Sequence, residues 1–414
     1  MTNLMTEEDE YYQEIVEGLL AFIDQGVVPI ESEHAEFLAD EYNIYDSNGL
    51  MSQKYREISQ QVRELSAEAG FYSLYGADEL GGGDLPASGI VQVEEALMHK
   101  YAPNRGLIHE SVIPSPFTNG VSPLLLQLKD EVLEPRIDAI RDGTATLCFA
   151  LSEPDAGSDV YNLRTRATPT DDGGWVINGQ KQWISNAAHA SHAFVFAITD
   201  PDAVKERRGG ITCFFVDTTD EGFSVDSGIP LMNSRGSNAT IISLTDLKVT
   251  RDQIVGEEGR GLNLALGGIS RGRLTMSAKC VGMARWALDQ SIAYAKTRKT
   301  FGRNIGDHQM IQAKLAEMAR DIYLCKSAVA RTAAMVDAGE DARKETSIVK
   351  MAATEMVGRV LDEAIQIHGG LGLTNELGLE SGYRYARMLR IPDGTSEIQR
   401  RTVAKLLLKG DTKL

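Results

Sequence analysis

Asp393 is the residue whose position in the sequence most favours chemistry. It stands directly before Gly394 and Thr395 in the stretch RIPDGTSEIQRR, residues 390–401, where a helix with periodic apolar residues is expected to begin. Backbone N–H groups at the start of a helix favour nearby negative charge and polar cofactors. A carboxylate there could act as a general base, although an ordinary helix cap would occupy the same position.

The segment LSEPDAGSD, residues 151–159, is a second candidate. It follows a predicted strand and is rich in turn-forming residues, so its hydroxyl and backbone N–H groups could bind the polar edge of a ring. Trp183 and Ser185 stand on a neighbouring predicted strand and would add an aromatic face and a hydroxyl. Taken separately, both segments are also explained by turn chemistry and core packing.

Three other patterns do not support a site. The GxSxG pattern at residues 268–272 lies inside a predicted helix, whereas the nucleophile elbow of serine hydrolases needs a strand before it. His189 and His192 have no carboxylate cluster nearby in the sequence, so no metal site is expected. No GxGxxG follows a strand and opens a helix, which disfavours a Rossmann dinucleotide site.

Composition narrows the class of protein. The 414 residues are 43% hydrophobic with a mean hydropathy of −0.20, which is typical of a soluble globular protein of two or three domains. Because no apolar run approaches the roughly eighteen residues that a membrane helix needs, no membrane span is expected. The acidic stretch 1–15 lacks the features of a signal peptide. The four cysteines form no CxxC pair, so a reduced protein with a cytoplasmic location is predicted; they are Cys148, Cys213, Cys280 and Cys325.

Net charge bears on the class of partner. The formal charge of −17 argues against nucleic acid as the main partner, because phosphate binding needs clustered lysine and arginine. The run RKTFGR at residues 298–303 is a candidate for a local basic patch, but a solvated helix end is the simpler explanation.

The apolar pattern divides the chain into helical, β and helical regions. Helices are predicted at 10–22, at 54–69 with Gly70 as a stop signal, and from 91 to 98. From about residue 146, short β-branched and aromatic runs alternate with turn signals, which predicts a small antiparallel β-domain, a barrel or a sandwich. Within it, Asn178 and Gly179 predict a hairpin turn.

After residue 259 the pattern is helical again. Apolar residues recur at spacings of four and three, which is typical of a four-helix bundle; they are Ile311, Leu315, Met318, Ile322, Cys325 and Val329. A further helix is predicted over 349–367. The resulting domains are an N-terminal helical domain at 1–143, a middle β-domain at 144–256 and a C-terminal helical bundle at 257–414.

Five motifs taken together resemble the acyl-CoA dehydrogenase family over nearly the whole chain. They are CFALSEPDAGSD at 148–159, INGQKQWISN at 177–186, TRKTFGR with Asp307 and Gln309, QIHGGLG at 366–372 and DGTSEIQR at 393–400. They occur in the family's order, which makes the resemblance specific. It implies an α+β fold with an N-terminal helical domain, a middle antiparallel β-domain and a C-terminal four-helix bundle.

The resemblance also implies an extended FAD, completed by contacts from a second subunit. By similarity, the isoalloxazine edge would be met by Phe149, Leu151 and Ser152, and its reactive face by Trp183 and Ser185. The adenine and pyrophosphate of a neighbouring subunit's FAD would be met by Arg298, Phe301 and Gln309, with further cofactor contacts from Gln366, Gly370, Thr395 and Glu397. Ser158 and Arg273 match positions that contact the CoA part of the substrate.

The reaction that the resemblance implies is α,β-dehydrogenation of an acyl-CoA thioester to the 2-enoyl-CoA. Asp393 would take the α-proton while the β-hydride goes to N5 of FAD, and electron-transfer flavoprotein would accept the electrons. A homotetramer built as a dimer of dimers is expected. A carboxylate in a dry pocket has a raised pKa, which suits a base near neutral pH.

Asp393 is also where this chain departs from the family. Most members have glutamate there, and the alternative site for the base, directly before Arg273, is Gly272 in this sequence. Aspartate is one methylene shorter, and misplacement by about an ångström can reduce the rate ~100-fold.

The sequence LRIPDG at residues 389–394 resembles an Asp-Gly subgroup of the family, some of whose members take longer or modified acyl chains. It also resembles the nitroalkane oxidases, which use aspartate and no CoA; Ser158 and Arg273 favour the CoA interpretation. A flavin-binding relative without dehydrogenase activity that associates with DNA is a further alternative, which the charge of −17 disfavours.

Overall fold

The computed structural model describes residues 7–115, 120–232 and 239–413, so the first six residues of the acidic N-terminal stretch lie outside the described part. The chain forms two compact units. The first, which we call the bundle unit, comprises Met1–Ala21, Pro86–His109 and Ile269–Leu414, and the second, the sheet unit, comprises Phe22–Leu85 and Glu110–Gly268. The three domains predicted from the sequence, at 1–143, 144–256 and 257–414, remain a prediction beside this division into two units.

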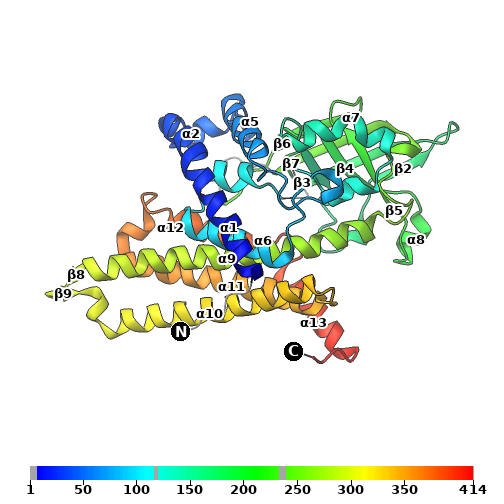
Figure 1. The fold of residues 1–414 in the computed structure, drawn as a ribbon. Helices are drawn as coiled ribbons and strands as arrows, with labels where there is room; N and C mark the ends of the chain where they lie inside the picture. Colours follow the sequence, from blue (N-terminus) through cyan, green and yellow to red (C-terminus); the bar gives the residue numbers. More distant parts are fainter. Residues whose placement is uncertain (1–6, 116–119, 233–238, 414) are drawn as a thin grey trace. The chain divides into compact units, whose positions relative to one another are not determined.

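The bundle unit is built from long helices (Figure 1). Its helices are α1 (Glu7–Phe22), α6 (Ala87–Lys100), α9 (Gly261–Thr297, in this unit from Ile269), α10 (Gln309–Asp337), α11 (Arg343–His368), α12 (Leu379–Met388) and α13 (Ser396–Leu408). A short hairpin of β8 (Lys299–Thr300) and β9 (Arg303–Asn304) and the 3₁₀ turn Ile305–Asp307 connect α9 to α10, and the 3₁₀ turn Gly369–Leu373 follows α11.

The apolar stripe of α10 packs into the core of the bundle unit, as predicted. Met318, Ile322 and Val329 are buried, and the other members of the stripe pack against the same core. Small side chains of α9 and α11, such as Ala284 and Ala353, are fully buried in that core. Small residues allow neighbouring helices to approach closely, so this packing accounts for the predicted helical bundle.

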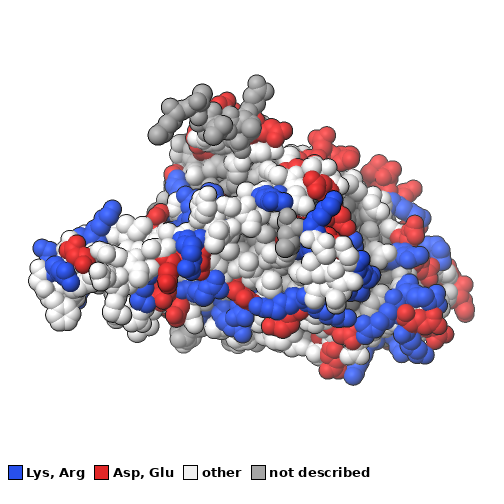
Figure 2. Space-filling model, turned by 90° about the horizontal axis from the view of Figure 1, so that it is seen from below, with Lys and Arg blue, Asp and Glu red and all other residues white. Residues whose placement is uncertain are grey.

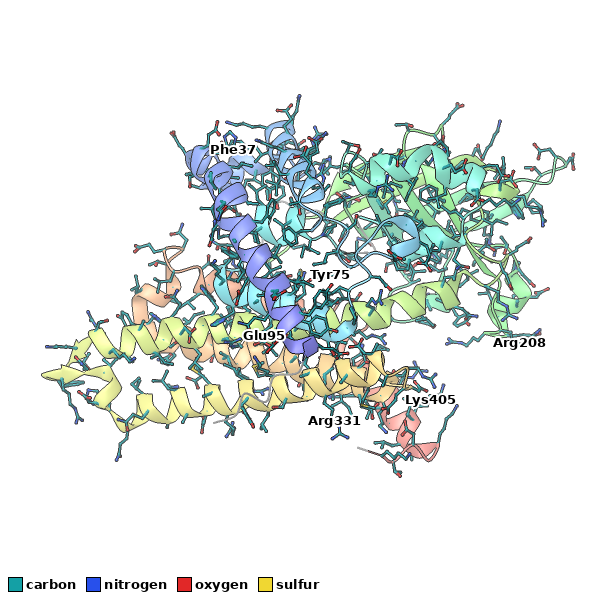
Figure 3. All side chains as sticks on the ribbon, in the orientation of Figure 1. Phe37, Tyr75, Glu95, Arg208, Arg331 and Lys405 are labelled. Atoms are coloured by element: carbon teal, nitrogen blue, oxygen red, sulfur yellow. The ribbon has the colours of Figure 1, made fainter. Side chains whose placement is uncertain are left out.

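Charged groups also connect the helices of the bundle unit. Glu95 on α6, which is labelled in Figure 3, accepts hydrogen bonds from Arg285 on α9 and from Lys326 on α10. The Nζ atom of Lys326 lies 2.6 Å from Oε1 of Glu95. The adjacent Glu94 lies 3.5 Å from Nζ of Lys279 on α9. Both glutamates are buried, since α6 is covered on almost every side.

The sheet unit combines short helices with a seven-stranded sheet (Figure 1). Its helices are the π-helix Ile23–Val27, α2 (Val28–Glu33), α3 (Ala35–Leu38), α4 (Glu41–Ile44), α5 (Gln53–Glu68), α7 (Asp130–Arg141) and α8 (Pro201–Lys205), with 3₁₀ turns at Asp78–Leu80, Pro123–Gln127, Val160–Asn162 and Arg251–Gln253. A second π-helix, Leu107–Val112, crosses the boundary between the two units along the chain. The strands are β1 (Leu147–Ala150), β2 (Arg166–Pro169), β3 (Trp175–Ser185), β4 (His192–Ile198), β5 (Ile211–Asp217), β6 (Phe223–Gly228) and β7 (Ala239–Val249).

The sheet has the strand order β1-β4-β2-β3-β7-β6, with β5 also paired to β4. Four of its pairings are antiparallel, while β1 and β2 each pair with β4 in parallel. Phe194 and Phe196 of β4 face one apolar core, and Ala193 and Val195 face another. Because both faces of β4 are covered, its sequence is a continuous apolar run rather than an alternating one.

The hairpin predicted at Asn178 and Gly179 is wrong. Both residues lie inside the single strand β3, at a shift in its register with β7. A Cβ atom on Gly179 would lie 2.3 Å from Oγ1 of Thr165, so glycine is present because another segment passes close to the backbone. Asn178 instead bonds to Asp246 on β7, through its Nδ2 at 3.1 Å and its Oδ1 at 2.9 Å.

The three helices predicted in the N-terminal part of the chain are confirmed. The predicted helices at 10–22, 54–69 and 91–98 correspond to α1, α5 and α6, and Gly70 has the positive φ of +81° that suits a residue after a helix. The GxSxG pattern lies within α9, with no strand before it. In the described ranges, we find no helix with the length and apolar character to cross a membrane, and no group of three or more potential metal ligands.

Candidate active site

Asp393 lies in the turn between α12 and α13 and has an unusual backbone conformation. Its φ is +55°, and that of Gly394 is +91°, so two consecutive residues are left-handed. Aspartate is one of the few residues besides glycine that adopt this conformation readily. The N-cap of α13 is Thr395, whose hydroxyl accepts a hydrogen bond from the N–H of Ile398 at 3.3 Å. The alternative in which Asp393 is merely the helix cap is therefore wrong.

Three side chains from three helices hold this turn through its carbonyl groups. Arg273 of α9 donates from Nε to the Asp393 carbonyl at 2.7 Å. Lys350 of α11 donates from Nζ to the Gly394 carbonyl at 2.9 Å. Gln399 of α13 donates from Nε2 to both, at 3.1 and 2.9 Å. The strained conformation of the turn is thus determined by contacts outside it.

The carboxylate of Asp393 is half-buried and makes no hydrogen bond or ion pair with any residue in the described ranges. Burial raises the pKa of Asp393 above its ordinary value of 3.8, while Lys350 and Arg273 act in the opposite direction. The result is a carboxylate that binds a proton more readily than usual and has no hydrogen-bond or ion-pair partner among the described residues. Both properties suit a general base.

The sheet unit holds the other predicted group of residues around the loop 151–159. Phe149 on β1 packs on Phe196 with ring centroids 4.7 Å apart, and Leu151 is buried. Ser152 accepts a backbone hydrogen bond from Gln182 of β3 at 3.0 Å. The loop that was predicted to meet a ring edge is therefore hydrogen-bonded to the strand that carries Trp183, although the strand before the loop, β1, is not adjacent to β3 in the sheet.

Trp183 has a strained backbone and a large exposed surface. Its φ is +66°, at a second register shift of β3, and 51% of the residue is exposed. Ser185 and Ser158 are also exposed. A large aromatic residue with a left-handed backbone is uncommon, and such strain is concentrated at functional sites. The geometry therefore supports a binding role for this part of β3.

Lys181 and Glu153 were missed by the sequence reasoning, although both lie within quoted motifs. Lys181 donates to Glu153 at 2.7 Å and to the Leu151 carbonyl at 3.1 Å. Glu153 also accepts the backbone N–H groups of Arg164 and Thr165. Burial lowers the pKa of Lys181 to about 8, against the effect of Glu153. Lys181 stands in step with the buried Trp175 and Ile177 along β3, and a charged residue at such a position was the signal that could have identified the pair.

Five of the remaining predicted residues lie in or beside the β8–β9 hairpin and the C-terminal end of α11, away from Asp393, whereas Glu397 lies near it. Phe301, in the β8–β9 hairpin, is 97% exposed and has a φ of +51°. Further exposed candidates are Arg298, Gln309, Gln366 and Gly370. His368 stacks on Tyr294 with centroids 4.5 Å apart, which brings the C-terminal ends of α11 and α9 together. Glu397 is exposed in the first turn of α13, beside Thr395 and near Asp393 in sequence.

Comparison with known families identifies the class. The family description "Acyl-CoA dehydrogenase, middle domain" matches residues 148–247, and "Acyl-CoA dehydrogenase, C-terminal domain" matches residues 259–408.

Individual relatives agree with this assignment. The probable acyl-CoA dehydrogenase YngJ of Bacillus subtilis is 36% identical over 354 residues, which are 85% of this chain and 91% of that protein. The subunit CarC of the caffeyl-CoA reductase-Etf complex of Acetobacterium woodii is 33% identical, with the same coverage of 85% and 91%. The structure of butyryl-CoA dehydrogenase from Megasphaera elsdenii has a TM-score of 0.81 and 27% identity, covering 99% of this chain and all of that one.

The chain belongs to the acyl-CoA dehydrogenase family. The predicted succession of N-terminal helices, middle β-domain and C-terminal helical domain is confirmed, and so is the class of flavoprotein oxidoreductase. The chemistry of the family is FAD-dependent dehydrogenation.

Proposed function

We propose that this protein oxidises an acyl-CoA thioester to the 2-enoyl-CoA and that Asp393 removes the α-proton. Membership of the family supports the class of reaction. The observation that supports the base is the carboxylate of Asp393, which has a raised pKa and no hydrogen-bond or ion-pair partner in the described part of the chain, and which lies in a turn that side chains of three helices hold.

The role of Asp393 follows from its surroundings. A thioester α-proton is weakly acidic, so an effective base needs a high proton affinity and a fixed direction. Burial supplies the first, while Arg273 and Lys350 keep the carboxyl ionised to a useful extent. The neighbouring Gly272 carries no carboxylate, so the alternative site for the base is absent from this chain.

The residues of the sheet unit fit a flavin. The exposed, strained Trp183 offers an aromatic face, and Ser185 offers a hydroxyl two residues later. Phe149, Leu151 and Ser152 would then line the edge of the ring system, on a loop held by Lys181 and Glu153. Bound FAD would supply the acceptor for the β-hydride, and these residues would bind and orient it.

A second copy of the chain would complete the cofactor site. Lys350, at the Asp393 turn, and Gln366 are sixteen residues apart on α11, which is about 24 Å along a helix. The exposed group formed by Arg298, Phe301, Gln309, Gln366 and Gly370 would therefore contact the FAD of a neighbouring subunit, with Thr395 and Glu397 acting nearer Asp393. This arrangement supports the proposed homotetramer, a dimer of dimers.

Substrate and electron partner are proposed by similarity. Ser158, exposed on its loop, and Arg273, whose Nε already binds the Asp393 carbonyl, would contact the CoA portion. Electrons would pass to electron-transfer flavoprotein; one relative is named as a subunit of a reductase complex with that protein. Asp393 and Gly394 support the proposed membership of an Asp-Gly subgroup, for which longer or modified acyl chains are candidate substrates.

Anaerobic titration of the flavin absorbance with straight, branched and aryl acyl-CoAs tests this proposal. Aryl thioesters belong in the panel because two relatives are named caffeyl-CoA reductase subunit and 3-(aryl)acrylate reductase. We expect one class of thioester to bleach the bound flavin. If only nitroalkanes bleach it, the oxidase alternative replaces the dehydrogenase. If neither a thioester nor a nitroalkane bleaches the flavin, the flavin has another role.

A further inference from the structure

We propose that Lys350 is a positioning residue: by holding the Gly394 carbonyl, it fixes the direction of the Asp393 carboxylate. This inference rests on the proposed function, in which Asp393 is the base. It concerns a residue that carries no chemistry itself and touches neither substrate nor cofactor in the proposal. Its effect on the reaction would act through the backbone of the Asp393–Gly394 turn.

Lys350 is a buried lysine with few hydrogen-bond partners. It is fully buried on α11, and within the described residues its only hydrogen-bond acceptor is the Gly394 carbonyl, at 2.9 Å. An ammonium group has three N–H donors, so its burial with one acceptor costs free energy of folding. A lysine at such a position therefore suggests a role other than stabilising the fold. Burial lowers the pKa of Lys350 to about 8, and the Asp393 charge opposes this shift.

The Asp393–Gly394 turn is a segment that needs external support. Both residues have a left-handed backbone conformation. Without contacts that hold the turn, Asp393 would adopt other conformations more readily, because the left-handed region is strained for a residue that is not glycine. Aspartate also has one fewer side-chain torsion than glutamate, so the direction of its carboxylate follows the backbone more closely. A small rotation of the peptide that Lys350 holds would therefore misdirect the base.

The charges around Lys350 define what its removal would change. The groups that influence it are Asp393, Cys280, Arg273 and Glu397, and those that influence Asp393 are Lys350 and Arg273. Since the ammonium favours the ionised carboxylate, its loss should raise the pKa of Asp393 further. A residue that merely fills space in the bundle unit would not produce that change.

Lys350→Met is the direct test, because methionine has similar length and no donor. The Gly394 carbonyl keeps the bond from Gln399, so the variant leaves no orphaned acceptor. We expect kcat to fall at least about 10-fold with KM within about 2-fold of wild type. We also expect the acid limb of the pH profile to move to higher pH. Infrared spectra of the ¹³C-aspartate-labelled protein, with Asp393→Asn as the reference, should report the same upward shift of the carboxyl pKa without turnover.

Lys344→Met is the matched control. Lys344 lies on the same helix, is 1% exposed and also donates to backbone carbonyls, but those of Asp411 and Lys413. Its loss should lower the melting temperature while kcat and the pH profile stay as in wild type. If both lysine variants reduce kcat equally, Lys350 is a structural residue and the inference is wrong.

The outcomes separate this inference from the proposed function. If Asp393→Asn turns over normally, Asp393 is not the base, and the positioning role of Lys350, which depends on that base, is rejected as well. If Asp393→Asn is inactive while Lys350→Met binds FAD and keeps the wild-type kcat and pH profile, only the inference is overturned. Should the methionine variant fail to fold, Lys350→Gln, which keeps an N–H donor but no charge, is tested in its place. A kcat and a pKa of Asp393 that both equal the wild-type values in that variant would contradict the inference.

Discussion

The Nζ atom of Lys181 lies 2.7 Å from Oε1 of Glu153, and the two side chains are 0% and 4% exposed. The pair joins the middle of β3 to the loop that carries Leu151 and Ser152. Burial alone would raise the pKa of Glu153, but Lys181, Thr165 and the backbone of Arg164 together lower it below its ordinary value of 4.5. The charge pair thus connects two segments far apart in sequence that the proposed flavin site requires.

Removal of one partner should leave a buried, uncompensated charge. We expect Lys181→Met to lower the free energy of unfolding by about 3–5 kcal/mol. The exposed Lys205→Met, on α8 of the same unit, should change it by less than about 0.5 kcal/mol. Urea unfolding at neutral pH measures both, and equal effects would show that the buried pair adds nothing.

The same pair predicts a dependence on pH. Because the pKa of Glu153 is lowered by folding, its contribution to stability is present above the unfolded value of 4.5 and is lost as pH falls through the folded value. Wild type should therefore lose more stability than Lys181→Met on acidification through this range. Urea unfolding at a series of pH values gives the comparison, and parallel curves would contradict it.

Gly179→Ala tests the reason for the misplaced hairpin. The Cβ atom of the new alanine would lie 2.3 Å from Oγ1 and 2.7 Å from Cα of Thr165, so either β3 or the segment that carries Thr165 would have to move. We expect a loss of about 1–3 kcal/mol in the free energy of unfolding. Gly157→Ala is the control, since its Cβ would meet no atom within 4 Å and its φ is not positive. Two variants of equal stability would mean that the close approach has no energetic weight.

Thr395→Ala should weaken the start of α13. The threonine hydroxyl accepts the Ile398 N–H, and loss of such a cap costs about 1 kcal/mol. Thr402→Ala, inside the same helix, removes only a bond to the Ile398 carbonyl and should have little effect. Thermal unfolding compares the two; a larger loss for Thr402→Ala would contradict the assignment of the cap.

Asp393 itself should show the opposite sign of pH dependence from Glu153. Folding raises its pKa, so its favourable contribution to stability is present below 3.8 and is lost as pH rises through the folded value. Asp393→Asn tolerates the left-handed backbone and does not ionise. The stability of this variant relative to wild type should therefore increase with pH and then level off. A difference that does not vary with pH would indicate an ordinary carboxyl pKa.

The sequence predicted the elements well and their long-range contacts poorly. Spacings of four and three predicted α10, because a helix that packs on one side imposes that period. The pair Asn178 and Gly179 misled because the close approach of Thr165, a residue of another segment, produces the same glycine as a turn does. Local patterns do not distinguish these two causes.

The same limit explains what was missed at the site. Asp393 was identified from its neighbours in sequence, whereas Lys350 and Gln399 act on it from other helices through backbone carbonyls. One signal for Lys350 was present: it lies in step with Ala353, Val357 and Leu361, on the buried side of α11. A lysine in such a stripe is unusual enough to suggest a buried partner. Acidic and basic side chains are interspersed over the face in Figure 2, so surface charge gave no comparable guide.

The most direct test of the central claim is the rate of anaerobic flavin bleaching in wild type and in Asp393→Asn, mixed with the best acyl-CoA of the panel. We expect both proteins to contain FAD and the same thioester to bind both. The flavin of the wild-type protein should bleach within the first turnover. In Asp393→Asn the rate of bleaching should be lower by at least about 1,000-fold, because the variant has no carboxylate to take the α-proton. Bleaching at the wild-type rate in Asp393→Asn would contradict the claim that Asp393 is the base.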